Sequence, residues 1–403
     1  MSLSTEVTDV NAAADTAAYR LERLEVGTLS PSRCREWVDL LEQHQSGSPM
    51  HDPRSLQERA VHGDRCTTAY FLYRAGRLCG VASFQTRDWP LKWQLGESTV
   101  AQFPLRRICL LAGGTVLPAD PTAYALLFQE IVKQQRSFDA VYLEDVRVDS
   151  YLWEFAHGDP VTQQSLFRYA AADPKPRVFL RLEGAFDDYM DKFSSKHRKN
   201  LKRMLRLFEE QAPGEVRSVR ITAPEDVESF LNQAVEISRK TYQWNLLGLG
   251  LRSPDSLKER LLFMARQDWL RAYVLTVKGI ACAFVIGFQY GGRYYLDDMG
   301  YDPAWRDYSA GKVLQLYLIR DLFEYRTPQI YDMGEYGPHK EEFGNDSYLQ
   351  GSIFLLNRRL YPRFICAGHR TCDAASTRLS AIAERFGWKK RLKNLIRAWS
   401  STT

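Results

Sequence analysis

Two stretches far apart in the chain share one pattern, "AYFLYRAGRLCGVASF" at residues 69–84 and "AYVLTVKGIACAFVIGF" at residues 272–288. Each is an apolar run, a short turn with a basic residue and a glycine, and a second apolar run, which predicts a β-hairpin. After each hairpin the sequence predicts a strand, a helix and another strand. These elements fall at residues 107–114, 121–135 and 138–146 in the first copy, and at residues 293–302, 310–325 and 329–337 in the second. The repeated order predicts a duplicated domain.

A strand that returns through a helix to another strand predicts a mixed, partly parallel sheet flanked by helices, so the expected fold class is α/β. The segment "AADPKPRVFLRL" at residues 171–182 contains Pro174 and Pro176, which interrupt regular structure between the copies. We therefore expect a first unit at residues 21–172 and a second at residues 177–358. Residues 1–20 are polar, without the pattern of a signal peptide, and are expected to be a disordered lead-in. Residues 359–403 are expected to form a basic, amphipathic helical segment.

The composition is that of a soluble globular protein, with 403 residues, 45% hydrophobic and 26% charged. A net charge of +5 favours a local anionic site over a general affinity for nucleic acid, so no DNA partner is expected. Seven scattered cysteines without a CxxC pair, and seven histidines without an HExxH motif, predict no metal site. The same cysteine pattern and the lack of a long apolar run predict a cytoplasmic protein.

The most basic stretch is "FSSKHRKNLKRMLRLFEEQ" at residues 193–211. Ser194 or Ser195 can cap a helix there, and the apolar residues recur at three- and four-residue steps. The cations therefore lie on exposed faces of the predicted helix. They form either a solvated face or a cradle for an anionic partner.

The loop "WRDYSAGKVLQLYLIRDL" at residues 305–322 joins a predicted strand to a predicted helix. Small residues allow close backbone approach there, and free N–H groups at a helix start can bind a phosphate. An ordinary helix start would look the same from the sequence alone.

Four stretches of the second half, between residues 185 and 357, resemble the GNAT acyltransferase superfamily. The resemblance is strongest to its CelD-type and BioF-like acetyltransferase branch, which is related to the Fem-type peptidoglycan aminoacyl transferases. The four stretches are "KHRKNLKRM", "VLTVKGIACAFVIGF", "YYLDDMGYDPAWRDYSAGKVL" and "IYDMGEYGPHKEEFG". The family's cofactor loop reads Arg/Gln-x-x-Gly-x-Gly/Ala, and this chain has Arg306-x-x-Ser309-x-Gly311. The first half resembles the same unit only in outline, since its loop "GGTVLPADPTAYALL" contains Pro118 and Pro121, which lack N–H donors.

The resemblance implies two tandem GNAT-like domains, of which the second is catalytic. It implies an N-acyltransferase that moves an acyl group, acetyl in the first instance, from acyl-CoA (acetyl-CoA) to an amine of a small, anionic acceptor. The expected cofactor-binding residues are Arg306, Ser309, Ala310, Gly311 and Lys312.

Carboxylates near the expected site are candidates for the general base that deprotonates the amine. Asp297 and Asp298 are neighbours in one strand, so only one of them can point into the site. Asp332 and Glu335 lie at the end of the last strand, where open α/β sheets bind ligands. Tyr336, like Tyr301 and Tyr308, is a candidate acid for the leaving thiolate.

The expected acceptor-binding residues are Lys196, Arg198 and Lys202 on the basic helix, together with Lys340. As a loop lysine, Lys340 either holds an acceptor carboxylate or phosphate or is simply solvated.

Two other functions remain open. One is a Fem-type transferase that uses aminoacyl-tRNA, and the other is a binding protein that keeps the fold without catalysis. Ser309 in place of the family's glycine favours the second of these. The basic, amphipathic stretch at residues 377–399 either docks on the domain or contacts an anionic membrane.

Overall fold

The computed structural model describes residues 18–44, 47–61, 67–95, 98–110, 115–133, 137–158, 164–240, 251, 254–325, 328–335 and 337–385. The strands are β1 (Tyr19–Glu25), β2 (Thr67–Arg74), β3 (Arg77–Asp88), β4 (Leu91–Leu95), β5 (Ser98–Phe103), β6 (Arg106–Leu110), β7 (Ala140–Arg147), β8 (Leu166–Tyr169), β9 (Lys175–Arg181), β10 (Val216–Ile221), β11 (Ala272–Val277), β12 (Ile280–Tyr290), β13 (Arg293–Tyr301), β14 (Ile330–Glu335) and β15 (Asp346–Asn357). The α-helices are α1 (Pro31–Gln43), α2 (Pro53–Val61), α3 (Pro121–Lys133), α4 (Tyr151–Gly158), α6 (Phe186–Asp191), α7 (Ser195–Glu209), α8 (Val227–Arg239), α9 (Pro254–Arg266), α10 (Ala310–Tyr325), α11 (Pro338–Phe343) and α12 (Leu360–Arg385).

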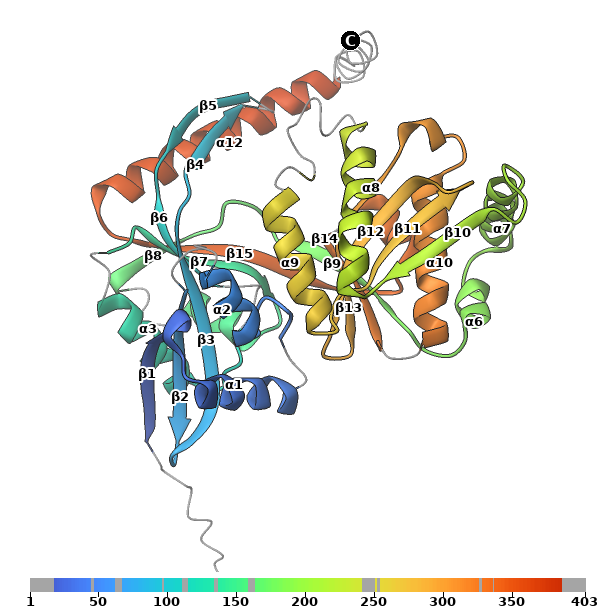
Figure 1. The fold of residues 1–403 in the computed structure, drawn as a ribbon. Coiled ribbons are helices and arrows are strands. Elements are labelled where there is room, and N and C mark those ends of the chain that lie inside the picture. The colour runs from blue at the N-terminus through green and yellow to red at the C-terminus, as the bar shows by residue number, and fades with distance from the viewer. Residues whose placement is uncertain are drawn as a thin grey trace, which may run out of the picture.

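One long sheet runs through both halves of the chain (Figure 1). Its strand order is β1-β2-β3-β6-β7-β15-β9-β14-β13-β12-β11-β10, with β8 paired to β15. In each copy a hairpin is followed by an antiparallel pairing and then a parallel one, β3–β6–β7 in the first and β12–β13–β14 in the second. The structure therefore confirms the α/β class, the two hairpins and the repeated order of elements.

The two copies meet through β9 and β15, which lie between β7 and β14. β15 pairs with β7 and β8 of the first half and also with β9 of the second. This arrangement brings the ends of β7 and β14, which occupy equivalent positions in the two copies, toward the middle of the molecule. The division at residues 172–177 stays a prediction.

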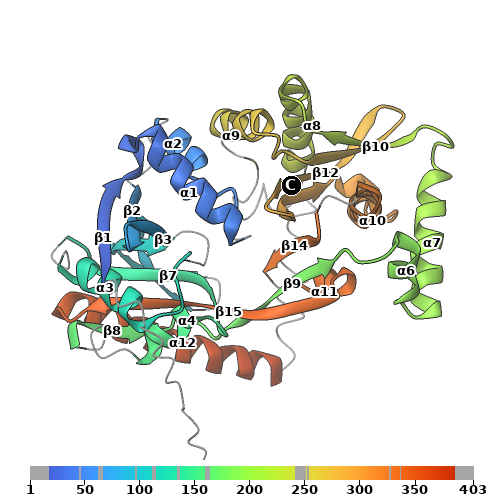
Figure 2. The ribbon, with the colours of Figure 1, turned by 90° about the horizontal axis from the view of Figure 1, so that it is seen from below.

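Helices cover both faces of the second half's sheet (Figure 2). Phe284 and Ile286 of β12 pack into a core with α8 and α9, while Ala283 and Val285 pack into a core with α6, α7 and α10. Because both faces are buried, this strand reads as a continuous apolar run rather than an alternating one.

The basic stretch forms α7, as predicted. Ser194 caps it by accepting a hydrogen bond from the N–H of His197 at 3.3 Å, and Leu201 and Phe208 of its apolar stripe are buried. The hairpin β4–β5 leaves the main sheet and packs with α12 on the first half (Figure 1).

The predicted lead-in lies outside the described residues up to residue 17, and β1 begins at Tyr19. α12 includes residues 377–385, and the rest of the predicted basic, amphipathic stretch lies outside the described residues. In the described part of the chain, no helix combines the length and the apolar character that a membrane span requires.

Candidate functional site

The sheet opens between β13 and β14, the parallel pair of the second half. These strands pair only between residues 293–295 and 330–332. Beyond this point, β13 has a register shift against β12 opposite Ile286 and Gly287, and β14 has one against β9 between Asp332 and Glu335. Gly334, with φ of 80°, lies inside the second irregularity. The carboxyl ends of the two strands therefore form no ladder with each other.

The predicted cofactor loop lies just after the carboxyl end of β13. Asp302 accepts a hydrogen bond from the N–H of Ala304 at 2.9 Å and so caps the short turn before α10. The first helical hydrogen bond of α10 runs from the N–H of Val313 to the carbonyl of Ser309, at 3.0 Å. The N–H groups of residues 310–312 precede this bond, as expected at a helix start that can bind an anion.

Gly311 and Ser309 give this loop its shape. A Cβ at Gly311 would come within 3.2 Å of the Tyr301 ring, so the helix start lies close against β13. Ser309 has φ of 57°, a left-handed conformation that is costly for a residue with a side chain. This is the position where the family's loop has glycine.

We expect the Ser309→Gly substitution to stabilise the protein by about 1 kcal/mol, because glycine adopts this conformation without a steric cost. Urea denaturation of the two full-length proteins measures the difference. A loss of stability would show that the Ser309 side chain is needed for the turn.

Lys312 links the helix start to two other elements. Its Nζ lies 2.7 Å from Oε2 of Glu342 on α11, and Nε2 of His197 on α7 lies 3.5 Å from Oε1 of the same carboxylate. Glu342 therefore holds the first turn of the basic helix beside the cofactor loop. The sequence patterns did not single out Glu342.

The two neighbouring carboxylates of β13 have different partners. Asp297 forms an ion pair with Arg260 of α9, at 2.5 Å, whereas Asp298 forms no ion pair within the described residues. Asp298 accepts a hydrogen bond from the N–H of Met299 at 2.7 Å, and burial raises the pKa of its carboxyl. Asp298 thus keeps the properties of a candidate base.

Asp332 is committed to a buried ion pair. Nε of Arg177 on β9 lies 2.9 Å from both of its carboxylate oxygens, and the N–H of Gly334 donates to Oδ1 at 2.9 Å. Asp332 is only 4% exposed. Burial alone would lower the pKa of Arg177, but the charge and hydrogen bond of Asp332, together with Tyr348 and Asp145, outweigh burial and raise it. The geometry gives Asp332 a structural role at the end of β14.

Glu335 and Lys340 lie around this ion pair. Glu335 is opposite Arg177 in the β14–β9 register, and a Cβ at Gly334 would lie 3.6 Å from Nζ of Lys340. Burial and the Arg177 charge lower the pKa of Lys340. Tyr336 lies outside the described residues.

The first half adds two carboxylates that the sequence analysis did not predict, Glu144 and Asp145 of β7. Asp145 has φ of 52°, and its N–H donates to Oγ of Ser352 at 3.1 Å. Burial and then the Glu335 charge raise the pKa of Asp145, and burial also raises that of Glu144. Both carboxylates lie near the carboxyl end of β7, as Asp332 and Glu335 do on the equivalent strand β14, so the internal repeat could have revealed them.

The predicted acceptor-binding residues fall in two places. Lys196, Arg198 and Lys202 lie on α7, at the edge of the second half farthest from the first (Figure 2), and Arg198 forms an ion pair with Asp191. Lys340 lies near the charges of Arg177, Asp332 and Glu335, at the end of β14. No group of three or more His, Cys, Asp or Glu side chains suited to a metal ion occurs in the described residues.

Residues 195–348 match the family model described as "Acetyltransferase (GNAT) domain". No curated protein matches the chain. The fold is similar to that of FemX, with a TM-score of 0.60 and 12% identity over 85% of this chain and 100% of FemX. L-PGS from Bacillus licheniformis, at 13% identity over 86% of this chain and 98% of its own, gives a TM-score of 0.47. A tandem GNAT protein from the clavulanic acid biosynthesis pathway, at 12% identity over 84% and 98%, gives 0.46.

The matched segment contains the whole opening between β13 and β14, the loop before α10 and the basic helix α7. Residues 195–348 therefore form a GNAT domain, and the fold of the whole chain is similar to that of FemX.

Proposed function

We propose that this protein is an acyl-CoA-dependent N-acyltransferase that acts in the cytoplasm on a small, anionic amine. The observation that carries the proposal is the separation of β13 and β14 directly beside the start of α10. The helix start offers N–H groups to a phosphate, and the unpaired edge of β13 offers backbone donors to a thioester carbonyl. Small residues at Ala310 and Gly311 allow the phosphates to approach the backbone closely.

Different residues around the opening can supply the general base and bind the acceptor. The acceptor amine must lose a proton before it attacks the thioester, and Asp298 and Glu335 are the candidate bases in the opening. Asp332 is the weaker candidate because Arg177 occupies both of its oxygens. Lys340, with its lowered pKa, lies close enough to the same cluster to bind an anionic group of the acceptor.

The raised pKa of Asp298 also predicts how stability depends on pH. Its pKa is raised in the folded state, so folding favours the protonated form, and stability is lost as the pH rises through that pKa. The Asp298→Asn variant does not ionise there. We therefore expect it to be more stable than the parent at neutral pH, with the difference shrinking as the pH falls through the raised pKa and vanishing below about 3.9, the ordinary pKa of aspartate. Urea denaturation at several pH values measures this, and a difference that grows toward low pH would contradict it.

Release of free CoA thiol from acetyl-CoA, in the presence of a panel of amino acids and amino sugars, tests the proposed reaction. We expect turnover with at least one amine that also carries a carboxylate or phosphate. The Asp298→Asn and Glu335→Gln variants then identify the base, because only loss of the true base lowers kcat while leaving acetyl-CoA binding unchanged. Acetyl-CoA that binds but is never consumed would favour the non-catalytic alternative.

The likeness to the FemX fold supports a second candidate, a transferase whose donor is aminoacyl-tRNA. A filter-binding assay with a mixture of aminoacylated tRNAs discriminates the two donors. Binding of charged tRNA without any affinity for acetyl-CoA would favour this candidate.

The basic helix α7 has its own test. Glu342 contacts both His197 of α7 and Lys312 at the start of α10, which supports a role for the charge of α7 in attracting an anionic ligand. We expect the double variant Arg198→Gln/Lys202→Gln to raise the acceptor KM about two- to fivefold at low salt, and the effect to fade at high salt as surface charges are screened. A KM that does not change at low salt would leave α7 as a solvated face. A change confined to CoA affinity would show that these cations bind the cofactor instead of the acceptor.

A further inference from the structure

Arg107 of β6 is a buried guanidinium that forms no ion pair with any described residue. The residue is only 4% exposed, and its side chain forms no hydrogen bond or ion pair with any described residue. Its Nε is buried and unpartnered. Burial lowers the pKa of Arg107, and the nearby charge of Glu144 offsets this effect only in part.

Aromatic rings surround this guanidinium. The centroids of Phe354, Trp89 and Tyr142 lie 4.9, 5.3 and 5.5 Å from its central carbon. A ring face attracts a cation by about 0.5–2 kcal/mol, whereas burying a charge costs several kcal/mol. The rings are also much weaker hydrogen-bond acceptors for Nε than an oxygen atom would be. They therefore offset only part of the cost.

A second arginine lies directly across the sheet. Arg87 of β3 is the partner of Arg107 in the antiparallel register, so both side chains project from the same face. Like charges in such a pair are destabilising. Nε of Arg87 donates to Oε1 of Gln85 at 2.7 Å, and neither arginine forms an ion pair in the part of the chain that the structure describes.

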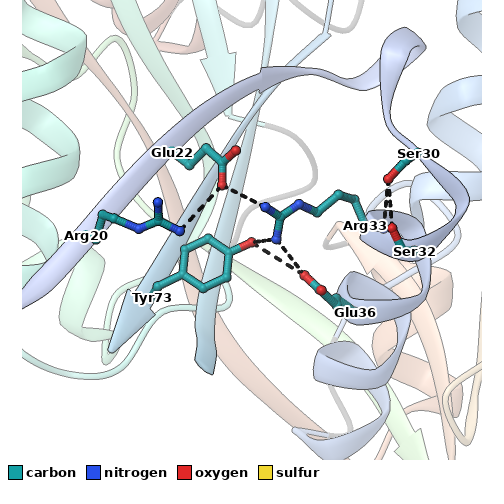
Figure 3. A network of polar contacts seen from close by, with 7 residues as sticks. All are labelled: Arg20, Glu22, Ser30, Ser32, Arg33, Glu36 and Tyr73. Atoms are coloured by element: carbon teal, nitrogen blue, oxygen red, sulfur yellow. Dashed lines mark hydrogen bonds and ion pairs between the residues drawn. The ribbon is translucent and has the colours of Figure 1, made fainter. Parts of the chain in front are cut away.

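Elsewhere the protein satisfies an arginine of this kind. Arg33 also lies against an aromatic ring, that of Tyr73, but Glu22 and Glu36 bind it at 3.1 and 2.9 Å (Figure 3). The pair Arg87 and Arg107 has no such ion pair among the described residues, and the Glu144 carboxylate acts on the two arginines only through its charge.

We propose that Arg87 and Arg107 form a binding site for the oxyanion of a small ligand, a carboxylate or a phosphate group. Guanidinium groups bind both through paired N–H donors. The site lies on the sheet face that α12 and the β4–β5 hairpin cover, with Trp89, 43% exposed, at its outer side. The aromatic walls favour a ligand with an apolar or planar body. This site belongs to the first half, and Glu144 interacts electrostatically with both of its arginines and with Glu335.

Thermal denaturation of the full chain in succinate, inorganic phosphate or chloride, at equal ionic strength, tests the proposal. We expect succinate or phosphate to raise Tm by roughly 2 °C or more over chloride, because a ligand that binds only the folded state stabilises it. The anion that gives the rise identifies the group that the site takes. Calorimetric titration of the same anion gives its Kd.

Variants assign the effect to this site. Arg107→Met should abolish the rise, while Arg33→Met, the matched control, should keep it. Arg87→Gln, at a less buried position, should weaken the Kd about tenfold and provides the test if Arg107→Met does not fold. The proposal is overturned if neither succinate nor phosphate raises the Tm of the parent protein, or if the arginine variants respond like the parent.

Discussion

Replacing Arg177 by methionine should lower the free energy of unfolding by about 3–5 kcal/mol, because it leaves the buried Asp332 carboxylate without a counter-charge. Arg177 supplies both Nε contacts to Asp332, and it lies on β9, in the middle of the continuous sheet. Urea denaturation measures the loss. We expect the unfolding of both halves to be affected, since β9 joins β14 to β15 and so connects the two halves.

The double variant Arg177→Met/Asp332→Leu is the control for this prediction. With both charges removed, no unpaired charge is buried, and most of the lost stability should return. Arg181 lies on the same strand as Arg177 and forms an exposed ion pair with Asp346 of β15. As a comparison, Arg181→Met breaks this pair and should cost no more than about 1 kcal/mol of stability. Equal losses for Arg177→Met and Arg181→Met would contradict the assignment of a buried, structural ion pair.

Gly311→Pro and Arg306→Glu should each weaken acetyl-CoA binding about tenfold or more, and together about a hundredfold. Proline removes one of the N–H groups that precede the first helical hydrogen bond of α10. Glutamate reverses an exposed charge in the turn before that helix. Calorimetric titration of each full-length variant with acetyl-CoA measures the effect.

An exposed arginine of the first half provides a control for the change of charge. Arg106→Glu alters the net charge by the same amount, but far from α10 in the sequence and at the start of β6. It should leave the affinity for acetyl-CoA unchanged. If Arg106→Glu weakened binding as much as Arg306→Glu, the effect would be one of overall charge, and the placement of the cofactor would lose its support.

Local patterns in the sequence predicted much of the fold. The hairpins, the basic helix with Ser194 as its cap, and the helix start at Ala310 depend on residues close together in the chain, so their signals are readable. The continuous sheet was not predicted. Its centre depends on β15 pairing with β7, β8 and β9, and such long-range pairings leave no local signature.

The sequence predicted only the part of the candidate site that depends on residues close together in the chain. Spacing identified the loop at Ser309 and Gly311, and the pairing of Arg177 with Asp332 came only from the structure, because 155 positions separate them. Asp145 joins the cluster from the other half of the chain. The burial of Arg107 without an ion pair among the described residues is likewise a property of packing, which a composition or a motif does not reveal.

Calorimetric titration of acetyl-CoA into the full chain tests the central claim, that acyl-CoA binds at the opening between β13 and β14, most directly. The account predicts saturable binding with one site per chain, weakened about tenfold or more by Gly311→Pro and unchanged by Arg106→Glu. Absence of acetyl-CoA binding by the parent protein, or binding that Gly311→Pro leaves intact, would contradict it.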